Sequence, residues 1–262
     1  MKKVLITLFF LSFSFLFAQS KISVAIPPLQ FIVEKIAKNH IFADSLFSEN
    51  YFEDYPSKSY LRKLSYSPIY LSLNLQREKS YIADLKAISR IKIIDVTKGI
   101  NKIDGNPYLW MDPLSFRKIV INVYDEIVKL DNKNEKLYKA NLDKFLRDID
   151  AIFLSIKEQL FSLSSYDFYT FNDYWDYYAK RFRLNLYKKK KETLDAKEIS
   201  DTITFTRKHD IKYFLVDPTD PKKIVDFFAK NSEAKPLVNN IFEKNWQANI
   251  FIFTQKIYDM YK

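Results

Sequence analysis

The sequence predicts an α/β fold of two lobes, each with a mainly parallel sheet, joined by a long linking helix. Short apolar strands alternate with amphipathic helices over residues 21–96, and the same alternation returns after residue 166. Between these two parts, residues 113–163 show only helical spacing of apolar side chains. Alternation of strands and helices is typical of parallel sheets, so the strand-free middle indicates a connection between two lobes.

The elements of the first half follow from local pattern. Apolar residues alternate at 21–26 and stop at Pro27 and Pro28, as a short strand does. Further strands are expected at 68–75 and 91–96, and helices at 31–40, 59–67 and 80–89.

Two helices are expected in the middle of the chain. The first covers 113–130, with Asp112 as N-cap and Pro113 at the first helical position. The second runs over 134–163 and spans roughly 45 Å at 1.5 Å per residue, which suits a rod between lobes.

The second half repeats the first. Strands are expected at 167–171, 211–217 and 234–238, and helices at 172–184, 195–210, 220–232 and 245–262. The predicted organisation is therefore a leader at 1–18, an N-terminal lobe at 19–131, a linking helix at 132–163 and a C-terminal lobe at 164–262.

The composition excludes several kinds of site. The 262 residues contain no cysteine, two histidines (His40 and His209) and two glycines (Gly99 and Gly105). Disulfides, thiolate sites and three-histidine metal sites are therefore excluded, as are the glycine-rich turns that hold nucleotide phosphates. Each histidine is expected at the end of a helix or on the surface.

The first 18 residues have the pattern of a secretory signal peptide. Two lysines precede an apolar run at 4–18 that ends in Ala18, and roughly 20 apolar residues would be needed to span a bilayer. We expect cleavage after Ala18 and a periplasmic protein without a lipid anchor, because no cysteine follows.

The net charge is +10, and removal of Lys2 and Lys3 leaves +8. Lysines are scattered among acidic residues, and the run at 188–191 falls between predicted elements. This distribution favours a solvated surface over a nucleic-acid site, so we expect no nucleic-acid partner.

Several stretches in order resemble the periplasmic metal-binding proteins of zinc and manganese ABC importers, known as the cluster A-I or cluster 9 family. They read IPPLQFIVEKIA (26–37), NPYLWMDPLSFRKIV (106–120), NEKLYKANLDKFLRDIDAI (134–152), FYTFNDYWDYYAKRFRL (168–184) and DAKEISDTITFTRKHDIKYFLVDP (195–218). The resemblance implies reversible capture of a small ion or molecule between two lobes and delivery to an ABC permease. We expect a monomer.

The resemblance also implies a metal site of three imidazoles and one carboxylate, and this sequence departs from it at every position. Tyr108 stands at the second histidine, Asn172 at the third, and Asn239 at the acidic position. Amide and phenol oxygens are poor ligands for zinc, so high-affinity zinc uptake through this site is not expected.

The first ligand position falls in the loop SENYFEDYPS. The alignment places Asn50 or Phe52 there, with Glu53 and Asp54 as possible substitute ligands. The metal-site candidates are therefore Asn50, Tyr108, Asn172 and Asn239.

Three functions remain open. In the first, the cleft binds another cargo: either a divalent or hard metal ion held by oxygens, with Asp173 or Asp217 nearby, or a small organic ligand on Tyr174, Trp175 and Tyr178. For these three aromatics, core packing is the competing interpretation.

In the second, the fold has lost its cargo and serves as an envelope interaction module. The third is an exported enzyme. It has little support, because Asp217-Pro218 and Asp220-Pro221 read as the end of a strand and the start of a helix.

Overall fold

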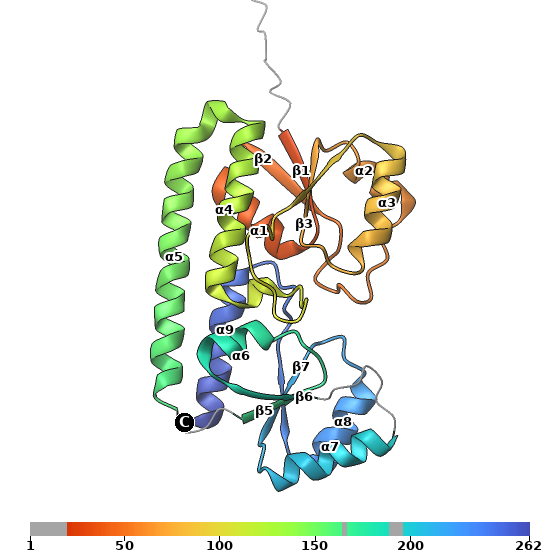
Figure 1. Cartoon of the computed structure of the whole chain (residues 1–262), viewed down its shortest axis with the longest axis vertical. Coiled ribbons are helices and arrows are strands. Elements are labelled where there is room, and N and C mark those ends of the chain that lie inside the picture. Colours follow the sequence, from red (N-terminus) through yellow and green to blue (C-terminus); the bar gives the residue numbers. More distant parts are fainter. Residues whose placement is uncertain (1–19, 164–166, 189–195) are drawn as a thin grey trace, which may run out of the picture.

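The computed structural model describes residues 20–163, 167–188 and 196–262. The expected leader at 1–18, the start of the second half at 164–166 and most of the lysine run at 188–191 lie outside these residues. Two α/β lobes lie one above the other along a single long helix, which confirms the predicted fold class (Figure 1).

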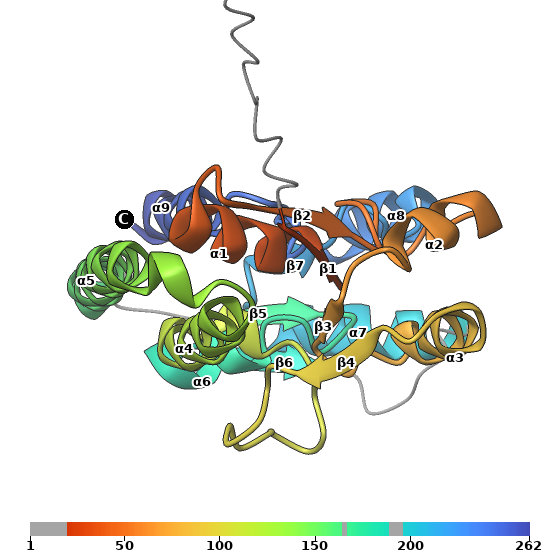
Figure 2. The ribbon, with the colours of Figure 1, turned by 90° about the horizontal axis from the view of Figure 1, so that it is seen from above.

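The N-terminal lobe is built on a four-stranded parallel sheet of order β2-β1-β3-β4. Figure 2 shows helices against both faces of this sheet: α1 (Pro27–Ala37) and α4 (Pro113–Leu130) on one face, α2 (Lys58–Leu64) and α3 (Glu78–Ile88) on the other. The strands are β1 (Ser20–Val24), β2 (Ile41–Ser45), β3 (Ile69–Ser72) and β4 (Lys92–Asp95).

The C-terminal lobe repeats this topology, with the order β6-β5-β7-β8. Its strands are β5 (Asp167–Thr170), β6 (Asn185–Lys188), β7 (Tyr213–Val216) and β8 (Lys235–Val238), and its helices are α6 (Asp176–Phe182), α7 (Ala196–Lys208) and α8 (Lys222–Ser232). In both lobes the chain reverses direction across the sheet between the first and third strands. Ligands of open parallel sheets bind at the carboxyl ends of strands at such a point, which in the C-terminal lobe lies between β5 and β7.

Helices α5 (Glu135–Phe161) and α9 (Trp246–Tyr261) hold the lobes together. The 27 residues of α5 extend about 40 Å along both lobes. Helix α9 packs against α5, and its Trp246 ring stacks on Phe116 of α4 with centroids 3.9 Å apart. The C-terminal helix therefore begins in contact with the N-terminal lobe.

The predicted start of α4 is confirmed. The Asp112 carboxylate accepts hydrogen bonds from the amides of Leu114 and Ser115, at 3.1 and 3.2 Å, with Pro113 at the first helical position. A short 3-10 turn, Leu109–Met111, precedes it, and another, Asn132–Asn134, precedes α5.

Two strands were not predicted, β2 and β6. Both are edge strands of four or five residues, so only one neighbour covers them and half of their side chains remain accessible. Such strands lack the apolar run that identifies a central strand. Helix α6 is also shorter than expected, because residues 171–175 form turns that carry the cleft residues.

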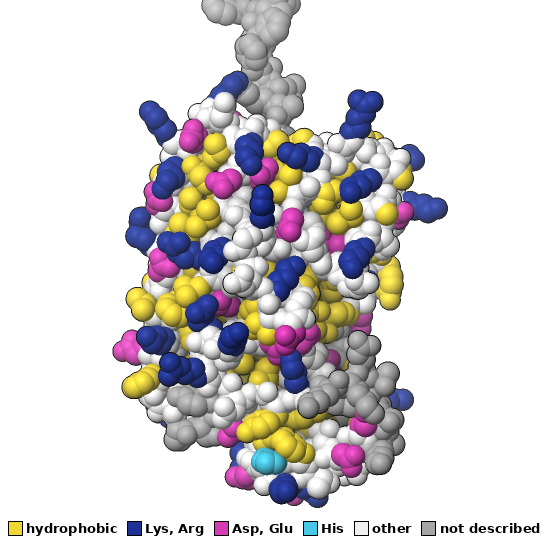
Figure 3. Space-filling model, in the orientation of Figure 1, with side chains coloured by type: hydrophobic (Ala, Val, Ile, Leu, Met, Phe, Trp, Pro, Cys, Tyr) yellow, Lys and Arg dark blue, Asp and Glu magenta, His cyan; other side chains and the backbone are white. Residues whose placement is uncertain are grey.

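None of the helices in the described ranges has both the length and the apolar character that crossing a bilayer requires. On the face seen in Figure 3, Lys and Arg side chains are dispersed among acidic ones and form no continuous stripe.

Candidate functional site

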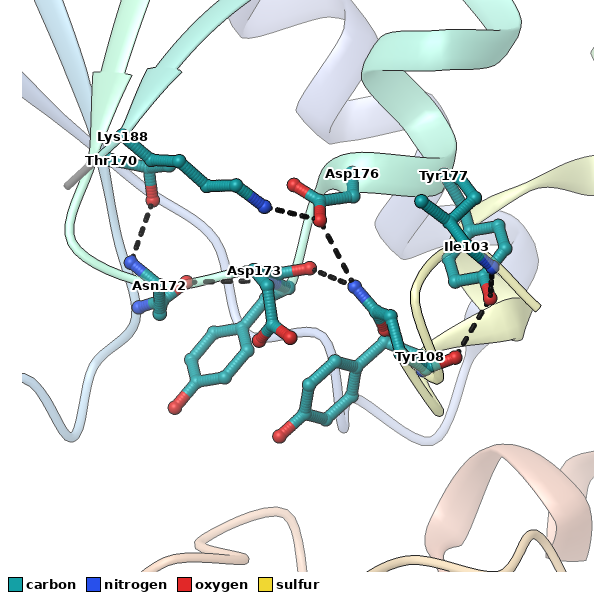
Figure 4. A network of polar contacts seen from close by, with 10 residues as sticks. Ile103, Tyr108, Thr170, Asn172, Asp173, Asp176, Tyr177 and Lys188 are labelled. Atoms are coloured by element: carbon teal, nitrogen blue, oxygen red, sulfur yellow. Dashed lines mark hydrogen bonds and ion pairs between the residues drawn. The ribbon is translucent and has the colours of Figure 1, made fainter. Parts of the chain in front are cut away.

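A hydrogen-bonded network joins the two lobes where the Tyr108 and Asn172 loops meet (Figure 4), and we call this region between the lobes the cleft. The side chain of Asn106, in the loop before α4, donates to the Asp173 carbonyl at 2.7 Å and to Asp176 at 3.2 Å. The Tyr177 hydroxyl donates to the Asn106 carbonyl at 2.7 Å and accepts from the Ile103 amide at 2.9 Å. This network fixes the loop that carries Tyr108 against the loop that carries Asn172.

Aromatic rings from both lobes meet inside this border. Tyr108 contacts Tyr174 with ring centroids 4.9 Å apart, and Phe52 stacks on Tyr174 at 5.3 Å. Tyr51 stacks on Phe242 at 4.2 Å, and Phe52 contacts Phe242 at 5.5 Å. These five residues, the aromatic cluster, bring together loops from four separate parts of the chain.

Of the two residues considered for the first ligand position, Phe52 contacts the rings of Tyr174 and Phe242, and Asn50 points elsewhere. Asn50 is exposed, and its amide donates to the Ser48 hydroxyl at 3.2 Å. Glu53 is exposed, and Asp54 accepts a bond from the Ser48 amide at 2.5 Å. Asn50 and Asp54 instead line a groove of about 600 Å³ on the N-terminal lobe, together with Lys244.

The Asn239 side chain has a structural role. It is 5% exposed, its Oδ1 accepts from the Trp175 indole at 3.0 Å, and its Nδ2 donates to Asn249 at 2.8 Å. Both polar atoms are therefore used in holding β8 to α6 and α9. The Asn239 amide, expected from the resemblance at an acidic ligand position, therefore has no free oxygen directed at a cargo.

Asn172 lies at the carboxyl end of β5, beside acidic residues that follow β7. Its Oδ1 accepts a long bond from the Tyr174 amide at 3.4 Å. Its side chain faces Asp220, although no well-formed hydrogen bond joins its buried Nδ2 to that carboxylate. Of the four metal-site candidates, Asn172 is therefore the one placed beside these carboxylates.

Asp217 is the most buried of these carboxylates, at 1% exposure. Its Oδ1 accepts from the Thr219 amide at 3.0 Å and hydroxyl at 2.5 Å, while its Oδ2 is buried without a hydrogen-bond partner. The Asp217 amide in turn donates to Asp220 at 2.8 Å. An unpaired buried carboxylate oxygen is costly, and a cation would relieve that cost.

Burial sets the protonation behaviour of the cleft. It raises the pKa of Asp217 and of Asp173, and burial together with the charge of Asp217 raises the pKa of Asp220 to about 6. Burial raises the pKa of Tyr108 and Tyr174 further above the ordinary value of a phenol, with smaller contributions from neighbouring phenols and carboxylates, and both phenols are neutral at pH 7. Asp173, Asp217 and Asp220 all lie near enough to Tyr174 to place negative charge around its hydroxyl.

In the described part of the chain, no three His, Cys, Asp or Glu side chains are grouped closely enough to hold a metal ion. The cleft therefore offers carboxylate, amide and phenol oxygens. His40 and His209 are both exposed near helix ends, as expected, and their rings lie near Tyr138 and Phe205.

Of the three aromatics considered for an organic ligand, two belong to the core. Trp175 and Tyr178 are fully buried, and the Tyr178 hydroxyl is 2.7 Å from that of Thr254. Only Tyr174 lines the cleft. Tyr51 and Phe242 were not predicted: Tyr51 lies in the loop SENYFEDYPS but was not singled out there, and the position of Phe242 depends on long-range packing.

A family model described as "Zinc-uptake complex component A periplasmic" matches residues 22–252. The chain belongs to this family. A curated member, the high-affinity zinc uptake system protein ZnuA of Bacillus subtilis (strain 168), is 23% identical over 145 residues. That match covers 53% of this chain and 44% of the length of the relative.

Solved structures share the fold of this family member. A crystal structure of ZnuA aligns with a TM-score of 0.85 and 23% identity, covering 92% of this chain and 98% of that one. The Mn-bound periplasmic metal binding protein from Candidatus Liberibacter asiaticus aligns at 0.81 and 19%, covering 93% and 100%. At these identities the similarity establishes the two-lobed architecture alone.

Proposed function

We propose that this chain is the exported solute-binding component of a metal-ion ABC importer and delivers its cargo to a membrane permease. Family membership over 22–252 and the two-lobed fold support this role. The proposal includes a periplasmic location after removal of the leader at 1–18, and a role in binding rather than catalysis.

The cargo we infer is a hard cation such as Mg²⁺, Ca²⁺ or Mn²⁺, bound by the carboxylates of Asp217 and Asp220. The observation that carries this inference is the buried, unpaired Oδ2 of Asp217, beside Asp220 and the Asn172 side chain. Carboxylate and amide oxygens are the ligands that these ions prefer, whereas zinc sites rely on imidazole and thiolate.

Thermal unfolding with added Mg²⁺, Ca²⁺, Mn²⁺ or Zn²⁺ tests the cargo. A ligand at one hundred times its Kd stabilises the folded state by about 2.7 kcal/mol. We expect one of the hard ions to give the largest shift in the native protein and D217N to abolish it. D201N, which removes an exposed carboxylate from α7, is the matched control and should retain the shift. A largest shift with Zn²⁺, or an unchanged shift in D217N, would contradict the proposal.

A cargo-free interaction module is the second candidate, because rings of the two lobes contact each other directly. Phe52 stacks on Tyr174, and Tyr51 on Phe242, so the lobes close on aromatic contacts without an ion. This candidate predicts no thermal shift with any of the four ions and binding to the permease that is indifferent to them.

A further inference from the structure

A groove of about 590 Å³ lies between the last turns of α5 and the end of α6, separate from the cleft. We call it the spine groove. The described residues that line it are Phe153, Lys157, Leu160, Phe161, Arg181, Phe182 and Arg183. Its volume falls within the range of roughly 300–1,000 Å³ that small-molecule sites occupy.

The floor of the spine groove is apolar. The rings of Phe153 and Phe182 are 5.9 Å apart, and Leu160 is 2% exposed. Phe161, one turn further along α5 than Lys157, is 87% exposed. An exposed phenylalanine beside other apolar side chains forms an apolar surface whose burial by a ligand is favourable.

The rim of the spine groove is basic. Lys157 and Arg183 are exposed, and neither has an ion pair or hydrogen-bond partner within the described ranges. Arg181 is fixed by Asp112 through two bonds of 2.7 and 2.8 Å. No acidic side chain is among the described residues that line the groove, so the groove attracts anions.

We propose that the spine groove binds a single-chain fatty acid. The carboxylate would lie between Lys157 and Arg183, and the acyl chain would cover Phe153, Phe161 and Phe182. An apolar floor next to unpaired cations matches a ligand with an acyl chain and one anionic head, and each buried methylene adds to the affinity. This site is independent of the cation cleft and of the function proposed above.

Displacement of the fluorescent anion 8-anilinonaphthalene-1-sulfonate by dodecanoate, below its micelle concentration, tests the proposal. We expect one saturable site in the folded protein, at least tenfold weaker binding in K157E/R183N, and unchanged binding in K136E/R147Q. Arg183 is replaced by Asn because the backbone φ of Arg183 is 59°, in the left-handed region that Asn tolerates. The control pair consists of exposed cations of α5 outside the groove.

Dodecanol has the same chain length as dodecanoate but no charge, so it measures the contribution of the carboxylate. It should bind at least tenfold more weakly than dodecanoate. Equal binding of the two, or unchanged dodecanoate affinity in K157E/R183N with native circular dichroism, would overturn the proposal. Displacement of the probe by a Glu-rich peptide that carries phenylalanine, without displacement by dodecanoate, would overturn it as well.

Discussion

Replacement of Asn239 by Asp introduces the carboxylate that the resemblance leads us to expect at this position, and we expect the change to destabilise the fold. The Asn239 Nδ2 donates to Asn249 at 2.8 Å, and at 5% exposure water cannot replace that donor. A carboxylate would face the Asn249 Oδ1, acceptor against acceptor. Loss of a buried hydrogen bond costs about 1–3 kcal/mol, and burial of the charge adds to it, so we expect about 3 kcal/mol at pH 7. For a chain of this size that lowers Tm by roughly 6–12 °C.

Thermal and urea unfolding of N239D against native protein measures this loss, with N101D as a control at an exposed asparagine. The penalty should shrink as the pH is lowered. Burial raises the carboxyl's folded-state pKa above its unfolded value, and the protonated acid can donate to Asn249. N239D should also gain no thermal shift with zinc, because Phe52, Tyr108 and Asn172 remain. A native Tm in N239D, or a new zinc-dependent shift, would refute the structural role of Asn239.

Two further changes probe the fold around the cleft. Burial raises the pKa of Glu78 to about 7, although the carboxylate accepts bonds from the Leu73 and Leu75 amides. Because the folded state keeps this proton to higher pH than the unfolded state does, the contribution of Glu78 to the free energy of unfolding should fall by about 3 kcal/mol as the pH rises from 4.5 through 7. Urea unfolding at pH 5 and 8 measures this, and E78Q should flatten the pH dependence. An unaltered pH dependence in E78Q would contradict the prediction. R181A removes both hydrogen bonds to Asp112, and because the Arg181 side chain is 36% exposed we expect the free energy of unfolding to fall by only about 1–2 kcal/mol. A double-mutant cycle with D112N that gives no coupling energy would contradict this.

Much of the fold followed from local signals. The Asp112-Pro113 step marks a helix start by capping chemistry alone, and the linking helix follows from its long helical spacing. The edge strands β2 and β6 were missed because their pairing with β1 and β5 comes from tertiary structure rather than from their own composition.

The cleft was predictable only in part. The motifs indicated Tyr108 and Asn172 as members of one site, but that Phe52 rather than Asn50 contacts Tyr174 and Phe242 depends on residues distant in sequence. A loop of this length has many conformations, and long-range packing selects among them.

The roles of Asn239 and Asp217 could not be predicted from the sequence, because they depend on residues that are distant along the chain. The structural role of Asn239 requires Trp175 and Asn249, and the unpaired oxygen of Asp217 is visible only once its surroundings are known.

The metal content of the native protein, purified without chelator, tests the central claim most directly. Elemental analysis should find one equivalent of a hard divalent cation per chain and none in D217N/D220N. One equivalent of zinc in both proteins, or no metal in the native protein, would contradict the claim that carboxylate oxygens of the C-terminal lobe hold the cargo.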